Sequence, residues 1–261
     1  MLADAQWTKL EPLIEACRPK GKTPQGKTPP QDLRRTLSAI VWRHQNGAKW
    51  RAIPAELGPW SRAAQTFIRW ARLGVWGRLL ALVQDRSVQL GMTFLDGTRI
   101  RAHQKAAGAA RKGGSQAERD QREALGRSRG GYGTKACVIA DGLGRAVAFI
   151  RTPGQAHELP HAIPLLDRLP AVPKWVVADR GYASYAFREH VWNLGARPAI
   201  PSKRNEAPLA CPDWIYANRN QVERLWSRLK EWRAIATRYE KTASSFMGVL
   251  SLAAALDWLK S

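Results

Sequence analysis

Cysteine is scarce in this sequence, and long apolar runs are missing from it. The three cysteines are odd in number and far apart, so the sequence predicts neither a disulfide framework nor a zinc cluster, and a reducing cytosol suits them. A membrane-spanning helix needs about 18 or more consecutive apolar residues, and no such run occurs. The amino terminus also lacks a charged segment followed by an apolar one, so we expect no secretion and no membrane partner.

Acidic residues are also few. The 261 residues include 42 Lys and Arg but 21 Asp and Glu, which gives a formal net charge of +21. The basic excess lies in residues 1–90, 91–135 and 200–261, whereas residues 136–199 are nearly balanced. A charge of this sign and size is typical of a protein that binds a polyanion such as nucleic acid.

Three of the few acids stand in contexts that favour a metal site. Asp96 follows the apolar run 92–95 and Asp179 follows the run 175–178, so each is predicted at the end of a buried strand. Glu223 lies in a helical stretch. Each acid taken alone is more often a turn, cap or surface residue. Together, three carboxylates form an all-oxygen ligand set of the kind that Mg²⁺ prefers.

The helical stretch around Glu223 also carries Tyr216, Arg219 and Lys230. At roughly 100° per residue these four side chains project from one face of the helix. Such a row is usually a solvated face with an ion pair worth about 0.3–0.5 kcal/mol. Cations on either side of a carboxylate also suit phosphate chemistry, because the acid can bind metal while the cations meet a DNA backbone.

In this order and spacing the blocks resemble those of a known family. The chain is similar to the bacterial insertion-sequence DDE transposases, specifically the insertion sequence five family, in Asp96-Gly97-Thr98, in Asp179-Arg180-Gly181-Tyr182 and in the row from Tyr216 to Lys230. Residues 126–135 and 152–155 add to this resemblance, which covers nearly the whole chain. It implies an α/β fold: a ribonuclease H-like catalytic core, with a mixed five-stranded sheet and flanking helices, preceded by an all-helical, helix-turn-helix-like domain.

The resemblance also implies an activity. Such an enzyme binds the terminal inverted repeats of an insertion sequence, cleaves DNA at the element ends and joins the 3′-hydroxyl ends to target DNA. Asp96, Asp179 and Glu223 would hold two Mg²⁺ ions, with Mn²⁺ as a substitute. The implied partners are double-stranded DNA and a second copy of the chain, in a homodimeric synaptic complex at the nucleoid in the cytoplasm. Two alternatives stay open: a host ribonuclease H-like nuclease that cuts without joining, and a catalytically idle DNA-binding regulator derived from a transposase.

Several basic and polar residues are expected to contact DNA. By the resemblance, Arg219 and Lys230 would steady backbone phosphates and Tyr216 would meet the DNA near the cut, while Lys135 and Arg180 join this set from the signature segments. A helix, tight turn and helix over residues 51–73 predicts a DNA-reading helix, although basic helical bundles without that role are equally common. Its contact candidates are Arg62, Gln65, Thr66, Arg69 and Arg72.

We expect a helical DNA-binding domain over residues 1–90. Residues 21–28 formally match a phosphate-binding loop, but no strand precedes them and prolines interrupt them, so we interpret them as a basic linker. Thr28 and Ser61 are expected to cap the second and fourth helices. The predicted helices span residues 4–16, 29–46, 51–57, 61–73 and 76–90.

The catalytic domain is expected over residues 91–261. Asp141 is predicted in a hairpin turn, and His157 and Glu158 at the cap of a helix. The segment 103–131, rich in Gly, Ala, Arg and Lys, is expected to be a flexible basic loop that buries no core. The predicted strands span residues 92–100, 132–141, 144–152, 174–179 and 197–201, and the helices span 158–168, 183–194, 217–237 and 243–260.

Overall fold

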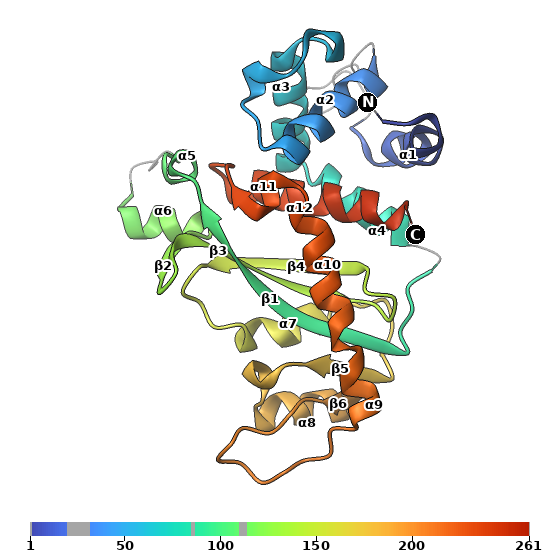
Figure 1. Cartoon of the computed structure of the whole chain (residues 1–261), viewed down its shortest axis with the longest axis vertical. Coiled ribbons are helices and arrows are strands. Elements are labelled where there is room, and N and C mark those ends of the chain that lie inside the picture. Colours follow the sequence, from blue (N-terminus) through green and yellow to red (C-terminus); the bar gives the residue numbers. More distant parts are fainter. Residues whose placement is uncertain (1, 20–31, 85–86, 110–113, 261) are drawn as a thin grey trace. The chain divides into compact units, whose positions relative to one another are not determined.

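The computed structural model describes residues 2–19, 32–84, 87–109 and 114–260 (Figure 1). The chain divides into two compact units. Unit 1 lies within residues 1–85, 101–123 and 229–261, and unit 2 lies within residues 86–100 and 124–228. The phosphate-loop-like linker and the Thr28 cap lie outside the described residues.

Unit 2 is built around a mixed sheet. Its main strands follow the order β4-β3-β1-β5-β6, and the short β2 pairs with β3. β3 and β4 are antiparallel, whereas β5 is parallel to both β1 and β6. The expected mixed sheet with flanking helices is therefore confirmed, although the sheet has seven strands among the described residues instead of five, because the short β2 and β7 (Thr237–Arg238) also pair with it. The strands are β1 (Met92–Ala102), β2 (Gly126–Ser128), β3 (Gly131–Ala140), β4 (Ala146–Pro153), β5 (Trp175–Ala178) and β6 (Arg197–Ala199).

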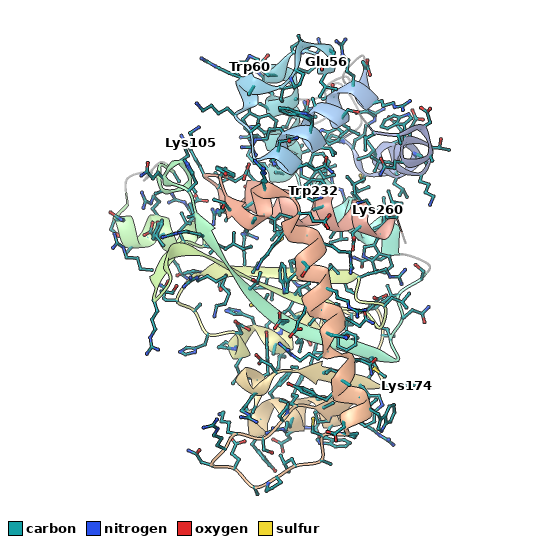
Figure 2. The ribbon with its side chains drawn as sticks, in the orientation of Figure 1. Glu56, Trp60, Lys105, Lys174, Trp232 and Lys260 are labelled. Carbon is teal, nitrogen blue, oxygen red and sulfur yellow. The ribbon has the colours of Figure 1, made fainter. Side chains whose placement is uncertain are left out.

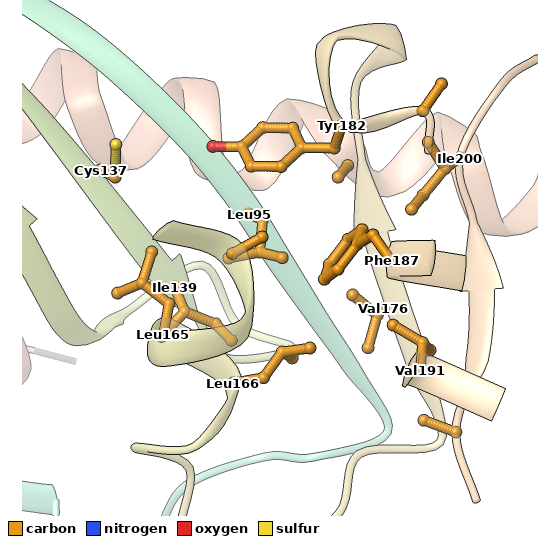
Figure 3. Close-up of a cluster of buried hydrophobic side chains, with 14 of the residues drawn as sticks. Leu95, Cys137, Ile139, Leu165, Leu166, Val176, Tyr182, Phe187, Val191 and Ile200 are labelled. Atoms are coloured by element: carbon orange, nitrogen blue, oxygen red, sulfur yellow. The ribbon is translucent and has the colours of Figure 1, made fainter. Parts of the chain in front are cut away.

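Helices cover both faces of this sheet. One face packs against α7 and α8 in a buried cluster that includes Leu95 and Val176, with Ile150 at its edge (Figure 3). Neighbouring side chains of a strand point to opposite faces, so Phe149 lies on the other face, where its ring is 6.1 Å from that of Trp226 on α10. The helices of unit 2 are α7 (Ala162–Leu166), α8 (Tyr185–Asn193), α9 (Asp213–Tyr216) and most of α10 (Asn220–Lys230).

Unit 1 is a helical bundle that contains residues from both ends of the chain. α12 is apolar on all sides and almost entirely buried, as is typical of a helix in a protein interior. It packs against α3 and α4, and Gly248 permits their close approach, because a Cβ there would lie 2.8 Å from Trp76. The helices are α1 (Asp4–Cys17), α2 (Leu33–Asn46), α3 (Trp60–Arg72), α4 (Val75–Gln84), α5 (Gln104–Ala107), α6 (Gln116–Arg122), α11 (Arg233–Ala236) and α12 (Ala243–Trp258).

The two units do not match a division of the chain at residue 90. α12 buries its apolar surface against the amino-terminal helices, and so belongs with them although it lies near the opposite end of the sequence. The last two residues of β1, Arg101 and Ala102, also belong to unit 1, where they pair in parallel with β7 (Thr237–Arg238). No helix among the described residues is long and apolar enough to span a membrane.

The segment expected as a flexible loop over 103–131 contains regular structure instead. It carries α5, α6 and β2, and it buries Ala106 and Leu125. Ser115 and Glu118 form a reciprocal capping box at the start of α6, a local signal that the composition of the segment obscured. The prediction that this segment buries no core was therefore wrong.

Two helix predictions also need correction. Residues 51–57 form two 3₁₀ turns, η1 (Trp50–Ala52) and η2 (Ala55–Leu57), with Pro54 between them. Ser61 lies inside α3, which starts after Pro59, so it is not the cap. The single helix expected over 217–237 is divided into η5 (Ala217–Arg219), α10 and α11.

Candidate active site

Asp96 and Asp179 lie side by side on two neighbouring parallel strands. The last paired residues of β1 and β5 are Leu95 and Ala178, so each acid is the next residue along its strand. Asp179 follows the end of β5 and accepts a hydrogen bond of 2.7 Å from the backbone N–H of Gly181. Asp96 was expected at a strand end, but it lies within β1, which continues to Ala102.

Arg219 brings Glu223 into the same site. Its Nη2 lies 3.2 Å from Asp96 Oδ1, and its Nη1 lies 2.5 Å from Glu223 Oε1. The second contact follows from the helical spacing, since residues four apart share a helix face. The first joins η5 to the sheet. Arg219 therefore links Asp96 to Glu223, and Asp179 is near enough to Asp96 for its charge to act on that carboxyl group.

Asp96 is mostly buried, and burial changes its acidity. Its side chain is 14% exposed, against 58% for Glu223. The pKa of the Asp96 carboxyl is raised from 3.8 to about 6, mainly by burial, which outweighs the lowering effect of Arg219; the negative charges of Glu158 and Asp179 also raise it. Proximity of carboxylates in a partly desolvated place disfavours their charged forms, and a bound cation would relieve this cost.

Glu158 is a fourth carboxylate at this site, and sequence reasoning assigned it another role. Its side chain makes no cap hydrogen bond. Instead, Oε1 lies 3.1 Å from Nζ of Lys135, and Oε2 accepts a hydrogen bond of 3.1 Å from the Tyr182 hydroxyl. A Cβ on Gly97 would come within 2.4 Å of the Glu158 carboxyl group, so a larger residue directly after Asp96 would require that carboxyl group to shift from its contacts with Lys135 and Tyr182. In the sequence, Gly97 was the local signal that another group lies close to the backbone directly after Asp96.

The remaining family-derived residues lie in differing environments. Tyr216, in α9, is partly buried, and this burial raises its pKa; the charge of Arg219 lowers the pKa and that of Asp179 raises it, so Tyr216 lies near both groups. Arg180 is exposed directly after Asp179, whereas Lys135 is held by Glu158. Lys230 is the last residue of α10.

The expected DNA-reading helix, α3, presents part of its predicted surface. Arg62, Gln65 and Arg72 are exposed, and Arg69 is partly exposed. Thr66 is 7% exposed and lies among the buried residues of the helix, because it follows the inward-facing Ala63 by three residues. The side chain of Thr66 is therefore turned away from the surface, contrary to expectation.

The acids fit a hard divalent cation by their chemistry. Asp96, Asp179 and Glu223 offer carboxylate oxygens alone, the donor type that Mg²⁺ and Mn²⁺ take. No three His, Cys, Asp or Glu side chains in the described part of the chain form a preassembled metal site. The Arg219 guanidinium, which contacts both Asp96 and Glu223, is the cation that neutralises this cluster in the structure.

A mixed sheet of this strand order, with neighbouring aspartates on two parallel strands and a glutamate on a later helix, defines a protein of the ribonuclease H-like class. Family models agree with this assignment. The model described as a transposase DDE domain matches residues 90–210, a second of the same description matches 176–260, and a putative transposase of the IS4/5 family matches 2–80.

Individual relatives point the same way. A putative transposase for insertion sequence element IS6501 of Brucella ovis is 35% identical over 129 residues, which are 49% of this chain and 98% of that protein. A putative transposase for IS402 of Burkholderia cepacia is 28% identical over 48% of this chain and 62% of its own length. The chain belongs to the insertion-sequence DDE transposases of the IS4/5 family.

Solved structures give a more distant likeness. The piggyBac transposase, in a synaptic complex with hairpin DNA, superposes with a TM-score of 0.42 and 10% sequence identity. The match covers 98% of this chain and 64% of that one.

Proposed function

We propose that this transposase binds the terminal inverted repeats of its element, cleaves the DNA at the element ends and joins the freed 3′-hydroxyls to target DNA. The observation that supports the proposal is the contact of Arg219 with both Asp96 and Glu223, together with the position of Asp96 and Asp179 directly after the last paired residues of the neighbouring strands β1 and β5. Metal ions held by these carboxylates would activate water or a DNA 3′-hydroxyl for direct attack, so no covalent enzyme intermediate is needed.

Asp96, Asp179 and Glu223 would hold the divalent ions, Mg²⁺ or Mn²⁺. When bound, such ions activate water or a 3′-hydroxyl and neutralise charge on the scissile phosphate and the leaving oxygen. Burial of Asp96 keeps this cluster partly shielded from water, which strengthens each electrostatic interaction made there. Gly181 holds one Asp179 oxygen through its N–H, and so orients that carboxylate.

The cations near the acids would receive the DNA backbone. Arg219 can present a planar pair of donors to a phosphate, the geometry that suits bidentate recognition. Arg180 is exposed beside Asp179, and Tyr216 is close to both. Lys230 would meet the backbone further along α10. Two element ends must be joined in one event, so we propose a homodimer with DNA.

A strand-transfer assay tests the proposal. Purified protein is incubated with a labelled duplex carrying its own element end, a plasmid target and Mg²⁺ or Mn²⁺. Metal-dependent nicking at the end together with joined products would support a transposase. Cleavage without joining would favour a nuclease, and specific binding with neither product would favour a DNA-binding regulator.

A further inference from the structure

Unit 1 contains a cavity of about 630 Å³ that the acid site does not use. Its walls come from the end of α2, from η1, α3 and α5, and from the segment between β7 and α12. All of these segments belong to unit 1. The volume falls in the range of roughly 300–1,000 Å³ that is usual for small-molecule pockets. Sequence reasoning gave these residues no common role, because they are far apart in the chain.

Aromatic rings form much of the wall. Trp50 and Phe67 pack with their ring centroids 5.8 Å apart, and Tyr239 and His103 with theirs 5.1 Å apart. Phe67 is fully buried, whereas Trp50, Tyr239 and His103 keep partial or full exposure at the cavity. The Arg43 guanidinium lies over the Trp50 ring, with its Cζ 4.7 Å from the ring centroid, so only the remaining exposed part of this ring is available to another flat group.

The Tyr239 ring lies close to the backbone of Gly47. Gly47 adopts a left-handed conformation with φ of 59° at the end of α2, and a Cβ on this residue would lie 3.0 Å from the Tyr239 ring. A side chain at position 47 would therefore press on the ring and strain the turn. The glycine and the tyrosine together define one side of the cavity.

The rim is positively charged. Lys49, Lys105 and Lys241 line the cavity and are exposed, Lys105 on the outer side of α5 (Figure 2). The only acid among the lining residues, Glu240, forms a buried ion pair with Arg43, so the two cancel. The three lysines thus give the cavity a net positive charge that suits an anionic ligand.

We propose that this cavity binds an unpaired nucleotide of DNA, with the base against Trp50 and Tyr239 and the adjoining phosphate on Lys105 or Lys241. A nucleotide combines a flat π-face with a negative charge, and single-stranded nucleic acid is recognised through this same combination of rings and cations. A concave site cannot take a base that remains stacked in a duplex. The cavity therefore selects unpaired or distorted positions. This inference rests on the DNA-binding part of the proposed function and adds a second contact outside the acid site.

The helix terminus beside the cavity contributes little to phosphate binding. Thr242 and Ser245 of the α12 amino-terminal turn line the cavity. However, the N–H of Ser245 already donates to the Thr242 hydroxyl, and the N–H of Ala243 donates to the Glu123 carboxylate. The lysines are therefore the phosphate-binding groups.

Photo-crosslinking of the unmodified full chain tests the proposal without relying on a variant. The probe is a short single-stranded oligothymidylate that contains 5-iodouracil, and the crosslinked residue is mapped by mass spectrometry. Crosslinks at Trp50, His103 or Tyr239 are expected. Crosslinks confined to the exposed rings of Trp60, Trp192 and Trp214 would overturn the proposal.

Binding of the same oligonucleotide then measures the role of each group. Tyr239→Leu should weaken binding about tenfold, as expected for the loss of one stacking ring, whereas Tyr239→Phe should bind normally. Lys241→Gln should weaken binding and reduce its salt dependence. Matched controls are Trp192→Leu and Lys260→Gln, at an exposed ring and an exposed cation that do not line the cavity.

A strand of abasic sites of equal length separates base from phosphate binding. It should bind about tenfold more weakly than oligothymidylate, and equal binding would overturn the proposal. Strand transfer is measured on the same preparations. If the protein carries out strand transfer but the crosslinks lie outside the cavity, only the proposal of a nucleotide-binding cavity is rejected. If the crosslinks lie in the cavity but the protein neither cleaves nor joins DNA, only the proposed function is rejected.

Discussion

Arg219 lies 3.2 Å from Asp96, although 123 residues separate the two in the sequence. The same guanidinium contacts Glu223, so one cation joins the strand acid to the helix acid. The positive charge of Arg219 therefore offsets part of the negative charge of these two acids. A metal ion that binds the same carboxylates would compete with Arg219 for them.

Replacing Arg219 should impair cleavage more than folding. Arg219→Gln removes the positive charge that contacts Asp96 and Glu223. Loss of one such electrostatic group commonly lowers the rate of the catalysed step about 10²–10³-fold. It should also raise the pKa of Asp96, since Arg219 lowers it. Single-turnover cleavage as a function of pH checks both effects, with Arg224→Gln, exposed on α10, as the control. A rate equal to wild type would remove Arg219 from the mechanism.

Asp179→Asn should abolish cleavage and leave binding to the element end intact. The amide keeps the size of the side chain but loses the charge that a metal ligand needs, so we expect a rate at least about a thousandfold lower. Gel-shift and cleavage assays on one preparation measure the two effects. Asp167→Asn, exposed after α7, is the matched control. Cleavage by the Asp179 variant at the normal rate would contradict the metal-site hypothesis.

The stability of the metal-free protein should fall as the pH rises through the pKa of Asp96. This pKa is about 6 in the folded protein against an ordinary value of 3.8. The folded state binds the proton more tightly, so the contribution of this group is fully present below pH 3.8 and is lost as the pH passes about 6. Thermal melting with and without Mg²⁺ measures this. The ion should stabilise the protein more at about pH 8 than at about pH 5, and Asp96→Asn should flatten the dependence.

Gly97→Ala should destabilise the protein through a clash with Glu158. The added methyl would lie within 2.4 Å of the carboxyl group, and overpacking of this kind typically costs about 1–3 kcal/mol. The double variant with Glu158→Ala should recover part of the loss, because the clashing group is gone. Urea unfolding of both single variants and the double variant gives the interaction free energy between positions 97 and 158. Additive losses would show that Glu158 does not restrict position 97.

The exposed arginines of α3 should contribute to DNA affinity without sequence preference. Arg62→Gln combined with Arg72→Gln should weaken binding and lower the salt slope by about 2, if each contacts one phosphate. Thr66→Val should leave the slope unchanged, because Thr66 is buried. Binding titrations over a range of salt concentrations measure these slopes. An unchanged slope in the double variant would exclude α3 as a backbone contact.

The sequence by itself determined the features that depend on near neighbours. The apolar runs before Asp96 and Asp179 predicted their strands, and the four-residue spacing predicted the contact of Arg219 with Glu223. These are short-range properties, set by the alternation of a strand and the period of a helix. The joint presence of the acids and their cations was enough to indicate the family.

Only the tertiary structure decided the features that depend on distant parts of the chain. It placed Glu158 against Gly97, buried Thr66, put α12 among the amino-terminal helices and closed the cavity between Trp50 and Tyr239. Each of these results from packing between segments far apart in sequence, and local patterns carry no information about which segments will meet. A carboxylate such as Glu158 looks like a helix cap until the fold brings a lysine, a tyrosine and a glycine to it.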